Sequence, residues 1–239
     1  MITDSVISYL SRKLQTTEQN IRREYIQIIF LSHFYQNPES EKIYFKGGTA
    51  LRIIYKSPRF SEDLDFNSTE VTINKIEDIV IQTVREIERE GILIDIKESK
   101  KTSGGYLAII NFSLHGEKID IKLEISQRKE KNIGEIITVI NDYIPPFTML
   151  AITRDLLVAG KINALLDRQK ARDFFDLYYI LRANFLPVRE KNVLKKALVL
   201  LEKSNVQFAK ELKIFLPKSH WGIIKDFKKS LMQEIKRVI

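Results

Sequence analysis

The sequence contains no cysteine among its 239 residues. This absence excludes a disulfide framework, a cysteine nucleophile and a metal site built on thiolates, and it is typical of proteins from a reducing compartment. Histidine occurs only at His33, His115 and His220, which are far apart in the sequence. A zinc site built on cysteine or histidine is therefore not expected.

Long apolar segments are also missing. No apolar run approaches the roughly 18 residues that a membrane-spanning helix requires. The segment MITDSVISYLSRKLQ has an acid near its start and no long apolar core, unlike a secretory signal. Since 44% of the residues are hydrophobic, the chain can still bury a substantial core. We therefore expect a soluble, cytoplasmic protein with no membrane partner.

Acidic residues are scarce only in the last quarter of the chain. Residues 182–239 hold 14 lysine and arginine residues against 5 acidic ones, whereas residues 1–181 hold 25 against 26. The whole net charge of +8 therefore arises from the last quarter. Such a basic region can bind a polyanion through its phosphates. Solvated lysine-rich helix faces would give the same composition, so the charge alone leaves both interpretations open.

The hydrophobic pattern predicts helices at both ends of the chain and a sheet between them. Residues 2–36 have helix-like apolar spacing, and residues 42–46 are typical of a short strand that ends at a glycine pair. An amphipathic helix is expected at 73–90, ending at Gly91. Four segments then alternate apolar with polar residues, as the antiparallel strands of a meander do: ILIDIKE, YLAIINFSL, KIDIKLEIS and IITVIND.

Pro145-Pro146 is expected to end the strand region, and the pattern turns helical again from residue 153. Strands grouped in the middle of the chain indicate an α+β fold rather than strict βαβ alternation. We therefore predict a sheet-bearing part at 1–145, which includes the N-terminal helices, and a basic helical part at 146–239.

The segment KGGTALRIIYKSPRFSEDLDF, residues 46–66, combines two features that core packing does not explain. Gly47-Gly48 ends a predicted strand before a helix, where glycine lets backbone N–H groups approach an anion and Thr49 can add a hydroxyl donor. Asp63 and Asp65 would point to one face of a strand and repel each other unless a cation such as Mg²⁺ lies between them. A tight turn and a solvated edge strand would explain each feature separately. Together they predict a site for a nucleoside triphosphate (NTP) and Mg²⁺.

A site for two metal ions would require a third carboxylate from a neighbouring strand. The segment KIDIKLEIS places Asp120, Lys122 and Glu124 on one face of its strand, with isoleucine and leucine on the other. Either acid could serve, and the residues alone do not decide between them.

The segments KGGTALRIIY, RFSEDLDF, IKLEIS and KINALLDRQKARDFFDLYYIL occur in this order, and through them the chain resembles the AbiEii/AbiGii-type toxin family. The resemblance covers about residues 43–183. It implies a nucleotidyltransferase-like fold of the DNA polymerase β superfold, with a mixed sheet, flanking helices and a C-terminal helical part. It also implies a toxin of a toxin–antitoxin or phage-defence pair, with a cognate antitoxin as partner.

The resemblance further implies roles for single residues: triphosphate binding, metal binding and completion of the active site from the helical part. The residues implied for the triphosphate are Gly47, Gly48, Thr49 and Ser61. Those implied for the metal are Asp63, Asp65 and Glu124, with Asp120 as the alternative third acid. Those implied from the helical part are Lys161, Arg172, Asp173 and Asp176. Those expected to be catalytic are Asp63, Asp65, Lys161 and Asp173, and Lys161 would also bind the nucleotide. The family often has an acid directly before this lysine, whereas this chain has Gly160.

Simpler explanations exist for the helical motif. Lys161 could be a surface lysine whose stem covers apolar area, and Asp173 could be a helix N-terminal acid in an ion pair. The expected activity is Mg²⁺-dependent transfer of a nucleotide from an NTP to an RNA such as tRNA, which would inhibit growth or translation, and the basic C-terminal region would bind the RNA. Nucleotidyl or phosphoryl transfer to a protein hydroxyl is the first alternative. A non-catalytic protein that binds a nucleic acid or a partner on the same fold is the second.

Overall fold

The computed structural model describes residues 1–128, 134–187 and 192–239. Within it the chain forms two compact units. The first comprises Met1–Lys56 and Phe60–Ile152, and the second comprises Ser57–Arg59 and Thr153–Ile239. The division between the units thus lies after Ile152, whereas the sequence predicts a boundary between residues 145 and 146. The upstream segment Ser57–Arg59 also belongs to the second unit.

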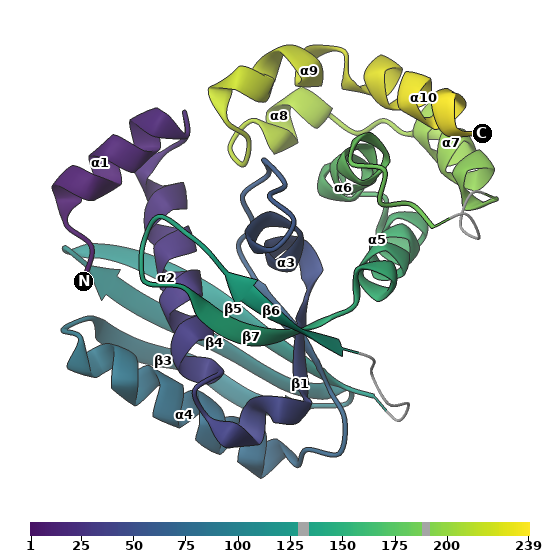
Figure 1. Cartoon of the computed structure of the whole chain (residues 1–239). Helices are drawn as coiled ribbons and strands as arrows, with labels where there is room; N and C mark the ends of the chain where they lie inside the picture. Colours follow the sequence, from purple (N-terminus) through teal and green to yellow (C-terminus); the bar gives the residue numbers. More distant parts are fainter. Residues whose placement is uncertain (129–133, 188–191) are drawn as a thin grey trace. The chain divides into compact units, whose positions relative to one another are not determined.

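The first unit is built on a seven-stranded mixed sheet with the strand order β3-β4-β5-β2-β1-β7-β6 (Figure 1). Strands β3, β4 and β5 form an antiparallel meander, as predicted for three of the four alternating segments, whereas the fourth, β6, pairs with β7 instead. Strand β2 is parallel to β5, and β1 is parallel to β7. This confirms the α+β class. The strands are β1 (Ile43–Lys46), β2 (Leu64–Ser68), β3 (Leu93–Thr102), β4 (Gly105–Leu114), β5 (Glu117–Gln127), β6 (Gly134–Val139) and β7 (Phe147–Ile152).

Strand β7 overturns the expectation that Pro145-Pro146 ends the strand region. The strand starts directly after the prolines, pairs with β6 along its length and lies beside β1, where Ala151 is opposite Phe45. Proline removes a backbone donor only at its own position. A strand can therefore begin at the next residue, and β6 pairs with this strand.

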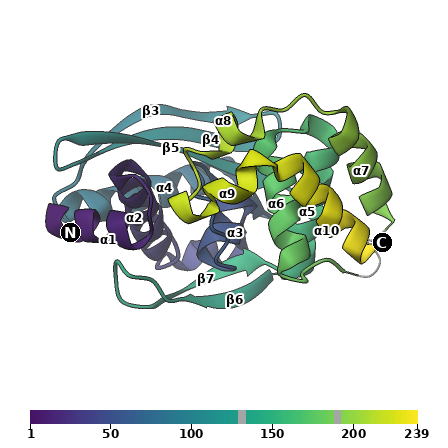
Figure 2. The same cartoon turned by 90° about the horizontal axis from the view of Figure 1, so that it is seen from above.

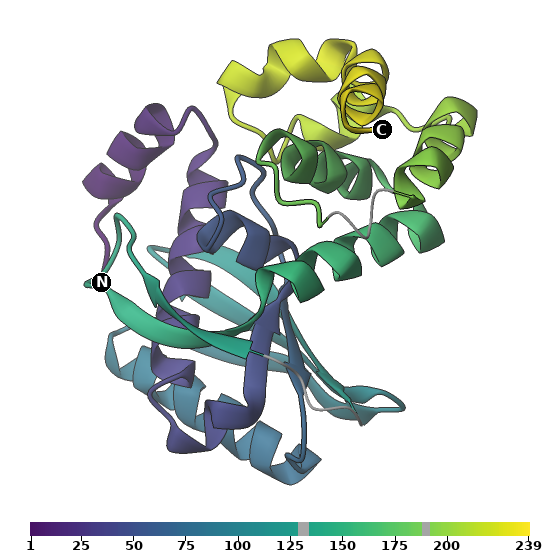
Figure 3. The same ribbon diagram turned by 45° about the vertical axis from the view of Figure 1, so that its right-hand side comes forward.

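Helices of the first unit pack on one face of the sheet. The single helical region expected at 2–36 is two helices, α1 (Asp4–Lys13) and α2 (Glu18–Phe34), because Gln15 has a left-handed φ of 53° and the Thr17 hydroxyl caps α2 (Figure 3). Helix α4 (Ile73–Arg89) contacts β3 and β4, and α2 contacts both β5 and β7. Figure 2 shows α2 between the meander and the β6–β7 hairpin, so the sheet curves around it. A 3₁₀ helix, η1 (Pro38–Lys42), leads into β1.

The second unit is helical, with the aromatic residues Phe174, Phe175, Phe208 and Phe227 buried in its core. Its first helix begins at Arg154, as the helical pattern from residue 153 predicted, and the described part of the lysine-rich region contains four helices, two of them a single turn long. The helices are α5 (Arg154–Arg168), α6 (Ala171–Arg182), α7 (Val193–Lys203), α8 (Phe208–Leu212), α9 (Trp221–Lys225) and α10 (Phe227–Val238), with a 3₁₀ turn η3 (Lys218–His220). Across the described ranges, none of the helices has the length and apolarity to cross a membrane.

Candidate active site

Asp65 lies on strand β2 between two side chains that are buried in the sheet core, and Asp63 directly precedes the strand. Leu64 and Phe66 are fully buried, and the Phe66 ring lies 5.2 Å from that of Phe34 and 5.3 Å from that of Phe45. Asp63 and Asp65 alternate with them and are half-buried. The predicted arrangement, with both carboxylates on one face, is confirmed by this burial pattern.

The backbone that leads into β2 is held from two sides. The Gln27 side-chain amide, on α2, donates to the carbonyl oxygens of Ser61 at 3.0 Å and of Glu62 at 3.1 Å. The buried Thr49 hydroxyl donates to the carbonyl oxygen of Asp63. Thr49 therefore fixes the start of the aspartate pair, and its proton already has an acceptor within the protein. A contact from Thr49 or Ser61 to a triphosphate stays a prediction.

Gly47 lies against the side chain of Asp65. It has a φ of +86°, and an added Cβ would overlap the Asp65 carboxylate and lie 2.8 Å from the Asp65 Cβ. A side chain at position 47 is thus excluded both by backbone conformation and by space. Helix α3 (Gly47–Ile53) starts at this residue, with Lys46 as its N-cap. The first glycine of the pair places backbone directly beside a carboxylate.

The strand register distinguishes the two candidates for the third acid. Strands β2 and β5 are parallel, and Asp65 is the register partner of Glu124. Asp120 lies further from this pair along β5, where it accepts from Lys97 at 2.8 Å and from Asn111 at 2.7 Å. Adjacent strands are about 4.8 Å apart. The register therefore favours Glu124 as the acid that accompanies Asp63 and Asp65.

Lys122 lies among these carboxylates. Its Nζ is 2.7 Å from Glu124 Oε1, and the lysine directly precedes Leu123, the register partner of Leu64 on β2. The bond to Glu124 raises the pKa of Lys122 above its usual value, partial burial opposes this, and the charges of Asp63 and Asp65 raise it further. Three carboxylates thus act on one ammonium group.

The donors at this position suit a hard cation such as Mg²⁺, which prefers carboxylate oxygens. In the part of the chain that the structure describes, no three acidic or histidine side chains are gathered as a finished set of metal ligands. One positive charge beside the carboxylates is the Lys122 ammonium, and Lys46 is the register partner of Asp65 on β1. Asp63, Asp65 and Glu124 are the residues that would hold a metal ion.

In the second unit, Lys161 and Arg59 share one buried carboxylate. Lys161 Nζ is 2.7 Å from Asp176 Oδ2, and Arg59 donates to both oxygens of Asp176, at 2.8 and 3.0 Å. The exposed fractions of the three side chains are 9%, 4% and 1% for Lys161, Arg59 and Asp176. Burial alone would raise the pKa of Asp176, but the two cations outweigh it and lower the pKa. Lys161 is therefore not a snorkelling surface lysine.

Asp173 is engaged at the start of α6. Its buried carboxylate accepts from Arg168 Nη2 at 2.8 Å and from the Lys170 backbone N–H at 3.1 Å. This is the geometry of an acid in the first turn that binds an otherwise unpaired N–H group. The contacts match the simpler explanation for Asp173, although its ion pair is buried on the acid side. The neighbouring Arg172 is half-buried.

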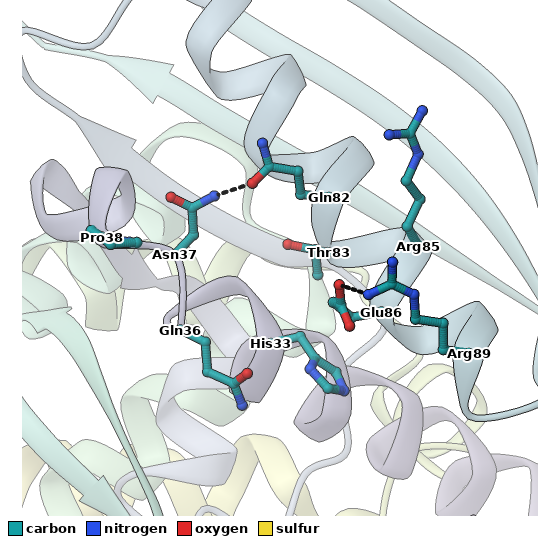
Figure 4. A pocket seen from close by; sticks show the side chains of 9 residues that line it. All are labelled: His33, Gln36, Asn37, Pro38, Gln82, Thr83, Arg85, Glu86 and Arg89. Atoms are coloured by element: carbon teal, nitrogen blue, oxygen red, sulfur yellow. Dashed lines mark hydrogen bonds and ion pairs between the residues drawn. The ribbon is translucent and has the colours of Figure 1, made fainter.

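A separate pocket of the first unit lies between the end of α2 and α4 (Figure 4). Its volume is about 460 Å³, and its polar lining includes His33, Gln82, Arg85 and Arg89. Figure 4 shows one bond across it, in which Asn37 donates to Gln82 at 2.8 Å. None of the predicted site residues lines this pocket.

The fold is that of nucleotidyltransferase-like proteins. Two crystal structures from Helicobacter pylori resemble it at 21% sequence identity, with 93% of this chain covered in both cases. One is JHP933, with a TM-score of 0.64 and 93% of its own chain covered. The other, a candidate nucleotidyltransferase, has a TM-score of 0.63 and 95% of its chain covered.

The family described as "Nucleotidyl transferase AbiEii toxin, Type IV TA system" matches residues 29–236. The chain therefore belongs to the AbiEii nucleotidyl transferase toxin family, as the four motifs predicted. Among curated proteins, no sequence matches this chain.

Three residues that contact predicted site residues were not themselves predicted: Lys122 and Gln27 in the first unit and Arg59 in the second. Lys122 was placed on the correct face of its strand, but its pairing with Glu124 follows from the β2–β5 register. Arg59 belongs to the motif RFSEDLDF, where its position next to the aspartate segment was the available signal. Gln27 lies in a helix with no motif, and nothing in the sequence distinguished it from other polar residues of that helix.

Proposed function

We propose that this toxin-family nucleotidyltransferase is Mg²⁺-dependent, acts in the cytoplasm and transfers a nucleotide from an NTP to an RNA such as tRNA. Its action would inhibit growth or translation, and a cognate antitoxin would neutralise it. One observation carries the proposal: Asp63, Asp65 and Glu124 all act on the ammonium of Lys122, and backbone at Gly47 lies against Asp65.

In the proposed reaction, an RNA hydroxyl oxygen forms a bond to the α-phosphorus of the NTP. The bond from that phosphorus to the bridging oxygen breaks, pyrophosphate leaves, and the hydroxyl proton is released. Mg²⁺ held by the three carboxylates would neutralise charge on the triphosphate and on the leaving pyrophosphate. Thr49 and Gln27 hold the backbone of residues 61–63 in place, so that the carboxylates need not reorganise during reaction.

For the second unit the proposal assigns Lys161 to the triphosphate, as the family motif implies. Lys161 and Arg59 carry two positive charges against the single negative charge of Asp176. A buried group with one excess positive charge favours an anion nearby. The basic residues of 182–239 would bind RNA phosphates.

The decisive experiment incubates the full chain with each labelled NTP, Mg²⁺ and total RNA, and in parallel with proteins from cells. The matched variants are Asp65→Asn and Asp95→Asn, since Asp95 is an exposed acid on β3. Label in RNA with the parent and Asp95→Asn, but not with Asp65→Asn, supports the proposal. Label in protein alone would move the acceptor to a protein hydroxyl.

If no acceptor gains label, if calorimetry with Mg²⁺ detects no NTP binding, and if Asp65→Asn stays as toxic in cells as the parent, the chain acts by binding alone.

A further inference from the structure

Lys122 belongs to the carboxylate site, and the proposed chemistry does not use it. Its ammonium is 2.7 Å from Glu124, two residues along the same strand, and the charge of Asp63 also acts on it. Asp65 and Glu124 are likewise neighbours across the two strands. We refer to these three acids and one base, Asp63, Asp65, Glu124 and Lys122, as the carboxylate square.

We propose that Lys122 is a built-in counter-ion that occupies the cation position of the carboxylate site and weakens binding of a divalent cation that arrives without a triphosphate. The inference rests on the proposed function, because it assumes that Asp63, Asp65 and Glu124 are metal ligands.

The charges of the square support this role. Three carboxylates carry three negative charges, and like charges on adjacent strand positions destabilise a sheet. The ammonium of Lys122 offsets one of these charges and binds Glu124 directly. A divalent cation that binds Glu124 must displace this ammonium or share the carboxylate with it. In either case the cation meets a positive charge at short range, which opposes its binding.

Lys122 also has room to move away. Its side chain is 42% exposed, and its four-carbon stem can turn the ammonium toward solvent. A triphosphate carries several negative charges. A cation that arrives with the nucleotide is attracted by these charges, which compensate for the repulsion from Lys122. The lysine thereby makes cation binding depend on the nucleotide.

The chain provides a matched control. Lys97 pairs with Asp120 at 2.8 Å, and its side chain is 45% exposed, against 42% for Lys122. Both ion pairs involve an acid on the same face of β5, but Asp120 is not a register partner of the aspartate strand. Replacement of Lys97 therefore removes an equivalent surface charge and leaves all four charged groups of the carboxylate square in place.

The test measures Mn²⁺ binding to the full chain by calorimetry, without nucleotide, for the parent, Lys122→Met, Lys122→Arg and Lys97→Met. We expect Lys122→Met to bind Mn²⁺ about tenfold more tightly than the parent. Lys122→Arg, which keeps the charge, and Lys97→Met should stay within about twofold. With a non-hydrolysable NTP analogue present, the difference between Lys122→Met and the parent should shrink.

A second readout is thermal unfolding in the presence of EDTA. There the square lacks its counter-ion in Lys122→Met, so this variant should unfold at a lower temperature than Lys97→Met, and Mn²⁺ should reverse the loss. Equal Mn²⁺ affinity of Lys122→Met and the parent would overturn the inference and leave the proposed function standing. Absence of Mn²⁺ binding by every variant, with and without the analogue, would instead overturn the metal dependence itself.

Discussion

Arg59 and Asp176 are 117 residues apart in the chain, yet the guanidinium and the carboxylate share two hydrogen bonds of 2.8 and 3.0 Å inside the second unit. Lys161 binds the same carboxylate at 2.7 Å. Because there are two cations and one anion, the partners are not equivalent. Loss of one cation leaves a neutral pair, whereas loss of the anion leaves two buried positive charges side by side.

This asymmetry predicts the order of two stability changes. Asp176→Asn should lower the free energy of unfolding by about 3–5 kcal/mol, since it leaves uncompensated buried charge. Lys161→Met should lower it by about 1 kcal/mol or less, since Arg59 still pairs with Asp176. Urea denaturation at neutral pH measures both. An equal loss in the two variants would show that the carboxylate does not depend on its two partners in this way.

The same carboxylate predicts a pH dependence. The folded-state pKa of Asp176 lies below its ordinary value because Arg59 and Lys161 outweigh the effect of burial. A lowered pKa contributes stability that is fully present above the unfolded value of about 3.9 and is lost as the pH falls through the folded value. The stability difference between the parent and Asp176→Asn should therefore be constant from pH 7 to pH 5 and shrink below about pH 4. Urea titrations at successive pH values check this. A difference that grows on acidification would contradict it.

Two glycines give opposite predictions for the same substitution. Gly47→Ala should destabilise the fold by about 1–3 kcal/mol and displace the Asp65 carboxylate, because its φ is +86° and the new methyl would overlap that side chain. The rate of nucleotidyl transfer should fall by more than the loss of folded protein would explain. Both are measured on the same preparation, by labelled-NTP transfer and by urea denaturation.

The control is Gly160→Ala, inside α5. Among the described residues, no atom lies within 4 Å of an added Cβ there, so the glycine does not serve close packing. Alanine should stabilise the helix by about 1 kcal/mol and leave transfer unchanged. If Gly160→Ala reduces transfer as much as Gly47→Ala, the effect of position 47 on Asp65 is not the cause.

The basic region predicts a salt-dependent interaction with RNA. Lys225 and Lys229 are exposed residues of 182–239. Lys225→Glu with Lys229→Glu should weaken RNA binding by about tenfold at low salt and flatten its dependence on salt concentration. Filter binding between 50 and 200 mM salt measures this, with Lys118→Glu on β5 as the matched charge reversal outside the region. Equal losses from both replacements would indicate a general charge effect.

Much of the sheet could be predicted because its signals are local. In DLDF, apolar residues alternate with aspartates, and this alternation alone predicts that Leu64 and Phe66 are buried while both aspartates share the other face. The turns at Gly104-Gly105 and His115-Gly116 indicate the β3–β4–β5 meander in the same way. Such patterns involve only neighbouring residues.

The unpredicted features depend on residues that are distant in sequence. That Glu124 and not Asp120 accompanies Asp65 follows from the parallel register of β2 and β5, which no local pattern encodes. Strand β7 follows two prolines, whose local effect is to interrupt a ladder, and forms because β1 and β6 pair with it. The partner of Lys161 is likewise set by the packing of α5 against α6.

The short segment Ser57–Arg59 has a consequence for how this chain can be divided. The chain passes into the second unit after Lys56, returns at Phe60 and passes over again after Ile152. A gene fragment that ends at Ile152 would still encode Arg59 but not Asp176. The helical part therefore cannot be removed at the last crossing without loss of a partner. A truncation there would leave Arg59 without the carboxylate that it binds.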